Sequence, residues 1–256
     1  MRSLLSSLDR LLAPPPEPGR VRWLGDWTYA HRGLHGPGRM ENSPTAFRAA
    51  LDAGLGIECD IQRSRDGIAM VYHDWDFSRL YDRSEACDTL DAADWRTLRS
   101  ASGEEGPVAL TDLLDLVAGR VPLLIEIKSR RGYAVERSCE QVVEALAGYA
   151  GRHAVMSFDP RVARWLRGYA PHILRGLVMR EDEHGHTRQA WQRHLALWIA
   201  KPDFVAYHVK ALPSPFVASL RGHGTPVLTW TVDSPASLAV ASAHADAPIA
   251  EGTGLP

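Results

Sequence analysis

The chain repeats one unit along most of its length: a short apolar stretch, a polar loop, and a helix whose start carries a capping residue followed by proline. A Ser or Asp side chain accepts a hydrogen bond from the first turn of a helix, and proline fits the first helical position because its missing N–H has no partner there. Strand followed by helix, repeated through a domain, is typical of an α/β fold with parallel strands. The capped starts are Ser43-Pro44, Asp159-Pro160, Ser214-Pro215 and Ser234-Pro235.

This succession, in a chain of 256 residues, predicts a single-domain (β/α)₈ TIM barrel over residues 1–256. A doubly wound open sheet is the alternative, but Gly33, Gly36 and Gly38 do not open a helix as a dinucleotide-binding turn does. We expect residues 3–12 to supply the eighth helix, since only seven helices intervene between the predicted strands. The strands are predicted near 27–31, 56–61, 122–127, 153–158, 173–179, 203–209, 226–232 and 247–250, and the helices near 43–53, 111–118, 133–147, 160–169, 187–200, 214–221 and 235–243.

One segment after the second predicted strand breaks the pattern. Only nine residues separate Ile61 from Val71, which is too few for a crossover between parallel strands. Asp66-Gly67 is a tight-turn signal, so residues 68–73 are predicted to return as the second arm of a hairpin. Residues 74–107, rich in Asp, Arg and Ser, are then predicted to be an insertion that covers the substrate at the barrel mouth.

Composition and charge limit the classes of protein to which the chain can belong. The 29 basic and 31 acidic residues give no basic excess, so no nucleic-acid partner is expected. The cysteines Cys59, Cys87 and Cys139 are far apart and form no C-x-x-C pair, which argues against a disulfide framework or a zinc site and favours a cytoplasmic location. No apolar run approaches the roughly 18 residues that span a bilayer, so no stable membrane insertion is expected. The sequence makes no prediction of the oligomeric state.

Residues 1–20 are predicted to form a helix and a proline-rich lead-in. Leucines recur at helical spacing from Leu4 to Leu12, and Asp9 and Arg10 interrupt them. No small-residue cleavage site follows, so the pattern does not indicate a signal peptide. We expect a short amphipathic helix that packs on the domain and ends at Pro14-Pro15-Pro16, and a membrane-surface anchor is the alternative.

Acidic residues gather on one face of two predicted strands. Glu58 and Asp60 alternate with apolar residues, so both carboxylates lie on the same face of their strand. Glu126 and Lys128 share a face of the third predicted strand of the barrel in the same way. Three carboxylates are a hard-oxygen ligand set suited to Ca²⁺ or Mg²⁺. A salt-bridge network with no metal is the alternative interpretation.

Two histidines are expected beside these acids. The first predicted strand ends in His31-Arg32, and the hairpin returns His73 toward the second strand. The working residues of (β/α)₈ barrels lie at the carboxyl ends of strands, so we expect these groups to converge. Arg32 with Lys128 would complement a phosphate.

Short motifs in a fixed order extend this pattern over roughly residues 29–232. They are Ala30-His31-Arg32-Gly33, Glu41-Asn42-Ser43, Ala46-Phe47, Glu58-Cys59-Asp60, Asp66-Gly67, Val71-Tyr72-His73-Asp74 and Ile125-Glu126-Ile127-Lys128, with weaker matches at Ser157-Phe158 and Thr229-Trp230-Thr231-Val232. Together these motifs resemble the glycerophosphodiester phosphodiesterase family, whose members are phospholipase-C-like phosphodiesterase barrels. No single motif of three residues would carry that resemblance.

The resemblance implies a role for each matching residue. It implies a divalent metal ion, Mg²⁺ or Ca²⁺, held by three carboxylates: Glu58, Asp60 and Glu126. It implies an acid/base pair of histidines: His31 and His73. It implies two groups that hold the phosphate, Arg32 and Lys128, and two aromatic residues that line the pocket, Phe158 and Trp230.

Family members cleave a glycerophosphodiester into glycerol 3-phosphate and an alcohol, and the resemblance implies the same small-molecule substrates here. Such a cleavage needs a base, an acid, and cations that offset charge on the phosphoryl oxygens. One alternative is phospholipase-D-like hydrolysis of lysophospholipids or sphingomyelin, which the segment Glu126-Ile127-Lys128 disfavours because those relatives are not expected to keep it. The other alternative is a barrel that binds phosphodiesters without catalysis.

The chain departs from the family at its last strand. Where a Thr-Asp pair would normally precede Arg-Pro, the sequence is Pro248-Ile249-Ala250-Glu251-Gly252. Glu251 is the candidate for the place of the aspartate, at the far wall of the predicted site. The preference for one alcohol over another is not predicted from the sequence.

Overall fold

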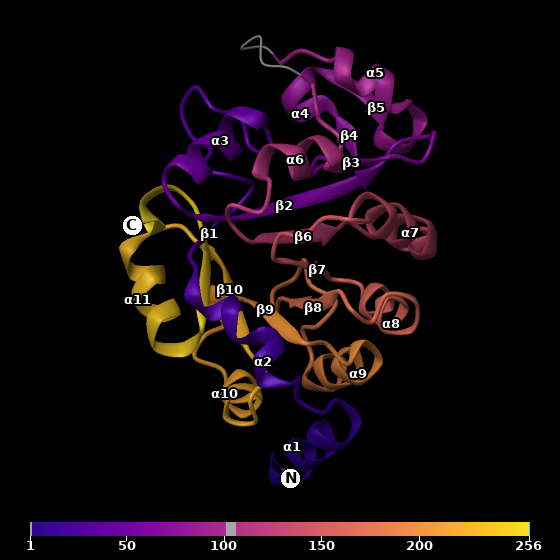
Figure 1. Ribbon diagram of the computed structural model, residues 1–256. Coiled ribbons are helices and arrows are strands. Elements are labelled where there is room, and N and C mark those ends of the chain that lie inside the picture. Colours follow the sequence, from indigo (N-terminus) through magenta and orange to yellow (C-terminus); the bar gives the residue numbers. More distant parts are fainter. Residues whose placement is uncertain (1, 101–105, 256) are drawn as a thin grey trace. The chain divides into compact units, whose positions relative to one another are not determined.

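The computed structural model describes residues 2–100 and 106–255. The chain divides into two compact units, residues 30–153 (the β2 unit) and residues 1–29 with 154–256 (the β10 unit). Within the described ranges, strands alternate with helices in the order of a (β/α)₈ barrel (Figure 1). The strands are β1 (Tyr29–Ala30), β2 (Gly56–Arg63), β6 (Leu123–Ile127), β7 (His153–Ser157), β8 (Leu174–Met179), β9 (Phe204–His208), β10 (Val227–Val232) and β11 (Ala247–Ala250). This order confirms the predicted fold class. Part of the predicted insertion, residues 101–105, lies outside the described residues.

The β10 unit contains parallel strands, and an α-helix follows each of them except β11, which is followed by the 3₁₀ helix η4 (Gly252–Gly254). Register pairs join β7 to β8, β8 to β9, β9 to β10 and β10 to β11. Buried apolar side chains from the strands and helices, such as Leu177, Val205 and Val217, form its core. The strands are β7 (His153–Ser157), β8 (Leu174–Met179), β9 (Phe204–His208), β10 (Val227–Val232) and β11 (Ala247–Ala250), and the helices are α8 (Pro160–Tyr169), α9 (Ala190–Ala200), α10 (Pro215–Gly222) and α11 (Pro235–His244).

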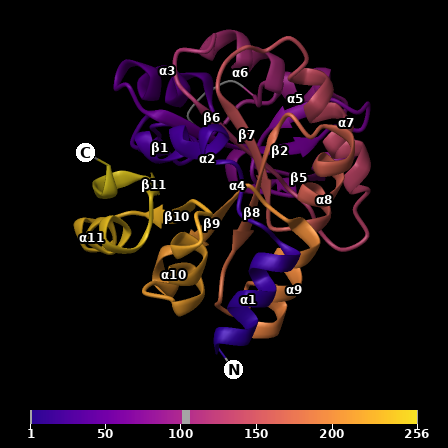
Figure 2. The ribbon, with the colours of Figure 1, turned by 60° about the horizontal axis from the view of Figure 1, so that its bottom comes forward.

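The N-terminal helix α1 (Arg2–Leu12) packs on α9 and α10 of the same unit (Figure 2). The buried carboxylate of Asp9 accepts hydrogen bonds of 2.8 Å from His194 and from Trp198 on α9. The predicted packing of this helix on the domain is therefore confirmed, and Asp9 is its anchor rather than an interruption. No helix among the described residues combines the length and the apolar character needed to cross a bilayer.

The prediction that this helix supplies the eighth helix of the barrel is wrong. The hydroxyl groups of Ser6 on α1 and Ser219 on α10 lie 2.8 Å apart, so α1 lies over two helices that already follow strands. The short 3₁₀ helix η1 (Arg22–Asp26), which follows α2 (Pro18–Val21), contacts β11, as does α11. Helix α1 packs on α9 because the buried carboxylate of Asp9 needs hydrogen-bond donors, and the rings of His194 and Trp198 on α9 supply them.

Three of the four predicted helix caps are formed. Ser43 accepts from the Ala46 N–H at 3.2 Å, and the side chains of Asp159 and Ser234 cap α8 and α11 in the same manner. Ser214 stands at the N-cap of α10, but its side chain makes no cap hydrogen bond. The fourth predicted cap therefore has the predicted residue at the N-cap position but lacks the predicted hydrogen bond.

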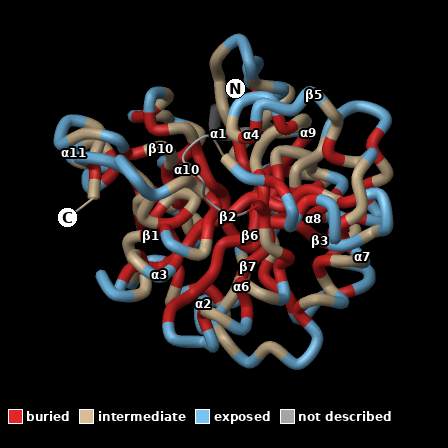
Figure 3. Tube along the Cα trace, turned by 90° about the horizontal axis from the view of Figure 1, so that it is seen from above, coloured by how far each residue is buried: buried red, intermediate tan, exposed pale blue. Residues whose placement is uncertain are grey.

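In the β2 unit, the long strand β2 (Gly56–Arg63) lies between β6 (Leu123–Ile127) and β3 (Ala69–Val71). It runs parallel to β6 and antiparallel to β3. Figure 3 shows that β6 is buried along its length and that β2 is buried up to its last residue, which is partly exposed. The helices of this unit that follow strands are α3 (Pro44–Asp52), α6 (Leu110–Val117) and α7 (Val135–Ala145).

The predicted hairpin joins β2 to β3, with Ile61 opposite Val71. Its turn is closed by Ser64, whose hydroxyl donates to the Asp66 carboxylate at 2.6 Å and accepts from the Ile68 N–H at 2.8 Å. Gly67 has φ +90°, a conformation that strongly favours glycine. The hairpin is confirmed, although its return strand is shorter than residues 68–73.

The described part of the insertion folds around four aromatic side chains, Tyr72, Phe77, Tyr81 and Trp95, here called the aromatic core. All four are buried, and the Phe77 and Trp95 rings meet edge to face with centroids 4.7 Å apart. Such pairs prefer this geometry and add to the free energy gained by burial. The elements around the aromatic core are β4 (Asp76–Phe77), α4 (Ser78–Tyr81), β5 (Arg83–Ala86), η2 (Cys87–Thr89) and α5 (Ala92–Thr97).

Candidate active site

Three carboxylates meet on the face of β2 and β6 that the strand alternation predicts. Asp60 is the register partner of Glu126, so their side chains point the same way, and Glu58 lies two residues before Asp60. All three residues are buried, with at most 6% of their surface exposed. One oxygen from each lies within 4.8 Å of the others, a spacing that suits ligands of one metal ion.

Two cations reach this cluster. The Lys128 ammonium lies 2.9 Å from Asp60 Oδ1 and 2.7 Å from Glu126 Oε1. Arg32 Nε lies 3.2 Å from Asp60 Oδ2, and the Arg32 backbone N–H donates to Glu58 Oε2 at 3.0 Å. The structure therefore brings together all five charged residues that the sequence placed at the metal and the phosphate.

The charges in this cluster act on one another strongly because water is excluded. Burial, together with the charges of Asp60 and Glu126, raises the pKa of Glu58 well above its ordinary value. Burial alone would raise the pKa of Asp60 as well, but Lys128 and Arg32 outweigh it and lower that pKa. Burial opposes the charge of Lys128, and Asp60 with Glu126 nevertheless raises its pKa. Asp60 and Lys128 thus form a charged pair, while the repulsion among the three carboxylates acts mainly on Glu58.

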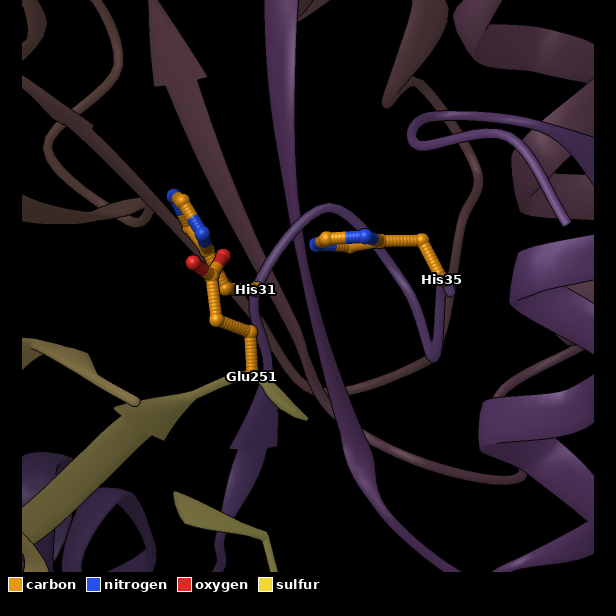
Figure 4. Close-up of side chains that lie close together, drawn as sticks. All are labelled: His31, His35 and Glu251. Carbon is orange, nitrogen blue, oxygen red and sulfur yellow. The ribbon is translucent and has the colours of Figure 1, made fainter. Parts of the chain in front are cut away.

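The loop after β1 carries His31 and Arg32 in a tight backbone turn. Arg32 has φ +55°, which is strained for a residue with a side chain, and Gly33 follows with φ +78°. A Cβ on Gly33 would lie 3.0 Å from Ala46 and Phe47, so helix α3 leaves no room for one. One ring nitrogen of His31 and one of His35 lie within 4.8 Å of each other (Figure 4). His35 was not identified from the sequence as part of the site.

His73 follows β3 and is fixed to β2 through its backbone neighbours. The Tyr72 N–H donates to the Asp60 carbonyl at 2.9 Å, and the Gln62 amide donates to the His73 and Asp74 carbonyls at 3.3 and 2.8 Å. His73 Nδ1 lies 2.6 Å from Asp74 Oδ1. Gln62 was missed in the sequence, although it continues the same alternating face of β2 by one more step.

Asn42 is a third residue to which the sequence assigned no role. Its side-chain amide donates to Asp60 Oδ2 at 2.9 Å, and its carbonyl oxygen accepts from the Asp60 N–H at 3.3 Å. Asn42 has φ +54°, a conformation that asparagine tolerates better than most residues. The place of Asn42 in the family motif Glu41-Asn42-Ser43 was the sequence feature that could have identified it as a residue of the site.

The β10 unit holds the two predicted aromatic residues in one cluster. Phe158 and Trp230 meet edge to face with centroids 5.3 Å apart. The His208 ring lies 5.1 Å from the Trp230 ring, and the Arg180 guanidinium lies 5.6 Å above it. Burial, followed by the charge of Arg180, lowers the pKa of His208. Arg180 pairs with Asp182, and neither Arg180 nor His208 was predicted to belong here.

Glu251 follows β11 in the β10 unit and is drawn in Figure 4. Its backbone N–H donates to the Val232 carbonyl at 2.9 Å, which fixes the chain just after the last strand. The side chain is half-buried. The proposal that Glu251 takes the place of the family's aspartate remains a prediction.

Comparisons with known proteins agree with the sequence motifs. The model of the glycerophosphoryl diester phosphodiesterase family matches residues 31–247. A glycerophosphodiester phosphodiesterase from Caldanaerobacter subterraneus subsp. tengcongensis is 26% identical over 216 residues, which cover 80% of this chain and 84% of the relative.

Solved structures show the same fold at low sequence identity. An Oleispira antarctica phosphodiesterase, in complex with the product sn-glycerol-3-phosphate, has a TM-score of 0.77 at 22% identity, over 88% of this chain and 92% of that one. A glycerophosphodiester phosphodiesterase from Thermotoga maritima has a TM-score of 0.71 at 21% identity, over 87% and 93% of the two chains.

Proposed function

The chain belongs to the glycerophosphoryl diester phosphodiesterase family, and we propose that it hydrolyses glycerophosphodiesters to glycerol 3-phosphate and an alcohol with a bound divalent metal ion. The observation that carries this proposal is the buried cluster of Glu58, Asp60 and Glu126 with Arg32 and Lys128. A site built in this way can hold both a metal ion and the phosphate of a diester.

The balance of charge in the cluster favours a metal ion. Three carboxylates face only two cationic side chains, and Glu58 has only the Arg32 backbone N–H among the hydrogen bonds described. Buried like charges repel unless a proton or a cation offsets them. Glu58, Asp60 and Glu126 would hold Mg²⁺ or Ca²⁺, which when bound supplies positive charge to the phosphoryl oxygens.

The other residues that match the family motifs would perform the remaining steps. Arg32 and Lys128 bind the phosphate and offset the charge that develops on it. His31 and His73 exchange protons with the attacking and leaving oxygens, a task that suits histidine near neutral pH. Phe158 and Trp230 contact the apolar parts of the substrate.

The experiment that tests this proposal is an assay of glycerol 3-phosphate release from glycerophosphocholine. Release should stop when a chelator removes the metal and return when Mg²⁺ or Ca²⁺ is added in excess. A panel of glycerophosphodiesters with different alcohols would then give the order of preference.

Three outcomes would contradict the proposal. Turnover that is unchanged by chelator would exclude the metal ion. Faster release of choline from a lysophospholipid than from the soluble diester would favour phospholipase-D-like hydrolysis, and binding without turnover of any diester would favour a non-catalytic barrel.

A further inference from the structure

One arginine of the insertion, Arg79, joins two parts of the candidate site. Its Nε donates to Asp74 Oδ2 at 2.6 Å. Its two terminal nitrogens donate to the Glu41 carboxylate at 2.6 and 3.1 Å. Asp74 contacts His73, and Glu41 contacts Arg32, so both neighbours of Arg79 lead directly to residues of the site.

On one side, the contact through Asp74 fixes the orientation of His73. Asp74 Oδ1 lies 2.6 Å from His73 Nδ1, while its other oxygen accepts from Arg79. Burial alone would raise the pKa of Asp74, but its hydrogen bonds with His73 and Arg79 lower it to about 2. An ionised carboxylate only accepts hydrogen bonds, so Nδ1 carries the hydrogen and Nε2 is left for proton exchange.

On the other side, the contact through Glu41 fixes the guanidinium of Arg32. Arg32 Nη1 lies 2.8 Å from Glu41 Oε1, the same oxygen that accepts from Arg79. Burial opposes the ionised form of Glu41, but Arg79 and Arg32 outweigh it and lower the pKa of this carboxyl. The Glu41 side chain is only 14% exposed, which strengthens its hydrogen bonds to both arginines.

The position of Arg79 is set by the aromatic core. Arg79 lies on α4 between Phe77 and Tyr81, which are both buried in that core. Tyr72, which precedes His73, belongs to the same core, and its hydroxyl donates to the Asp76 carbonyl at 3.0 Å. The chain segments that carry His73 and Arg79 are therefore anchored by the same packed side chains.

We propose that Arg79 is a positioning residue that holds His73 and Arg32 in register with each other through Asp74 and Glu41. This proposal rests on the proposed function, since it assigns proton transfer to His73 and phosphate binding to Arg32. A guanidinium group fits the task because it donates along two edges at once, whereas an ammonium group acts as a point charge. The insertion thus contributes to the site through a side chain that need not touch the substrate.

The test compares R79Q, R79K, D74N and E41Q by steady-state kinetics with the metal-loaded protein. Supporting partners of this kind are typically worth about 10–100-fold in activity, and R79Q is expected to lose that much of kcat/KM. D74N should lower mainly kcat, E41Q should raise mainly KM, and R79Q should change both. The kcat/KM of R79K should lie between those of wild type and R79Q, because lysine keeps the positive charge but cannot donate along two edges as the guanidinium group does.

R83Q is the matched control. Arg83 lies in the same insertion, is 47% exposed, and pairs with Glu85 rather than with any residue of the site. R83Q should keep wild-type kcat and KM. In R79A, millimolar guanidinium ion should restore part of kcat/KM, and it should leave R83Q unchanged.

A structural role alone gives a different pattern. If Arg79 only stabilises the insertion, R79Q will lower the melting temperature, the loss of activity will follow the folded fraction, and guanidinium will restore nothing. A fully folded R79Q with the kinetics of R83Q would also overturn the proposal. If the wild type hydrolyses no glycerophosphodiester at all, the proposed function fails first.

Should R79Q fail to fold, R79K and the D74N/E41Q pair still decide the matter. The proposal requires that D74N lower mainly kcat and that E41Q raise mainly KM. It also requires that ¹⁵N NMR of the imidazole show hydrogen on Nδ1 of His73 in the wild type and a mixture of tautomers in D74N. Equal effects of D74N and E41Q on KM, with an unchanged tautomer, would overturn it.

Discussion

The β2 unit and the β10 unit both place polar and aromatic side chains at or near the carboxyl ends of strands, but they do so with different chemistry. In the β2 unit, three carboxylates with at most 6% of their surface exposed face the side chains of Arg32 and Lys128. In the β10 unit, the rings of Phe158, Trp230 and His208 contact one another, and the nearby cation Arg180 already has its own partner in Asp182.

This difference separates two tasks that one fold can support. Buried opposite charges interact strongly because the local dielectric constant is low, so they suit the stabilisation of charge in a reaction. Aromatic rings offer area and shape, which suit contact with uncharged parts of a ligand. We therefore expect substitutions of the carboxylates and histidines in the β2 unit to change mainly the rate of the reaction, and substitutions of the aromatic residues in the β10 unit to change mainly the binding of substrate.

The largest effect is expected from D60N. This substitution removes a proposed metal ligand that also contacts Lys128 and Arg32, so kcat should fall by about 10³-fold or more, the equivalent of several kcal/mol. The measurement is glycerol 3-phosphate release at saturating substrate and metal.

D203N is the control for this substitution. Asp203 is also buried and paired, with Arg175, but it lies just before the start of β9 rather than at a carboxyl end. Its loss should reduce stability and leave kcat near the wild-type value. If D60N and D203N reduce kcat equally, the proposed difference between Asp60, which acts in the reaction, and Asp203, which only stabilises the fold, is wrong.

The next effect is expected from H31A and H73A, measured separately. Each removes one proposed proton-transfer group, so kcat should fall by about 10²–10⁴-fold while the thermal midpoint changes little. H172A, at an exposed position, serves as the control. A wild-type rate in either site variant would remove that histidine from the mechanism.

A smaller effect is expected from W230A in the β10 unit. Loss of the ring should raise KM by about tenfold with kcat nearly unchanged, because contacts of one aromatic side chain are worth about 1 kcal/mol beyond burial. W191A is the control, since Trp191 is 65% exposed on α9. A fall in kcat without a change in KM would contradict the division of tasks between the two units.

The smallest effect concerns acid stability and the carboxyl of Asp74. Its pKa of about 2 lies below the ordinary value near 4, so the stabilisation that it gives is present above about pH 4 and is lost as the pH falls toward 2. The melting temperature of the wild type should exceed that of D74N by a few degrees at pH 6, and the gap should close toward pH 3. E85Q, which alters an exposed pair, should show no such closing gap.

The sequence predicted the fold and the charged cluster for local reasons. Period-two alternation assigns Glu58 and Asp60 to one face of β2, and the shortness of the chain from Ile61 to Val71 leaves only a hairpin. Both inferences use residues that are close in the chain, where geometry follows from the backbone. The same reasoning misplaced α1, because the partners of Asp9 lie nearly 190 residues away on α9.

By itself, the sequence determined the order of strands and helices, the family, and the residues Glu58, Asp60, Glu126 and Lys128 on their shared face. Only the tertiary structure decided which groups are bonded to these residues. The link from His73 through Asp74, Arg79 and Glu41 to Arg32 joins two loops and helix α4, which no periodicity relates. Hydrogen bonds of this kind depend on distances of a few tenths of an ångström, which packing of the aromatic core sets and a sequence pattern does not.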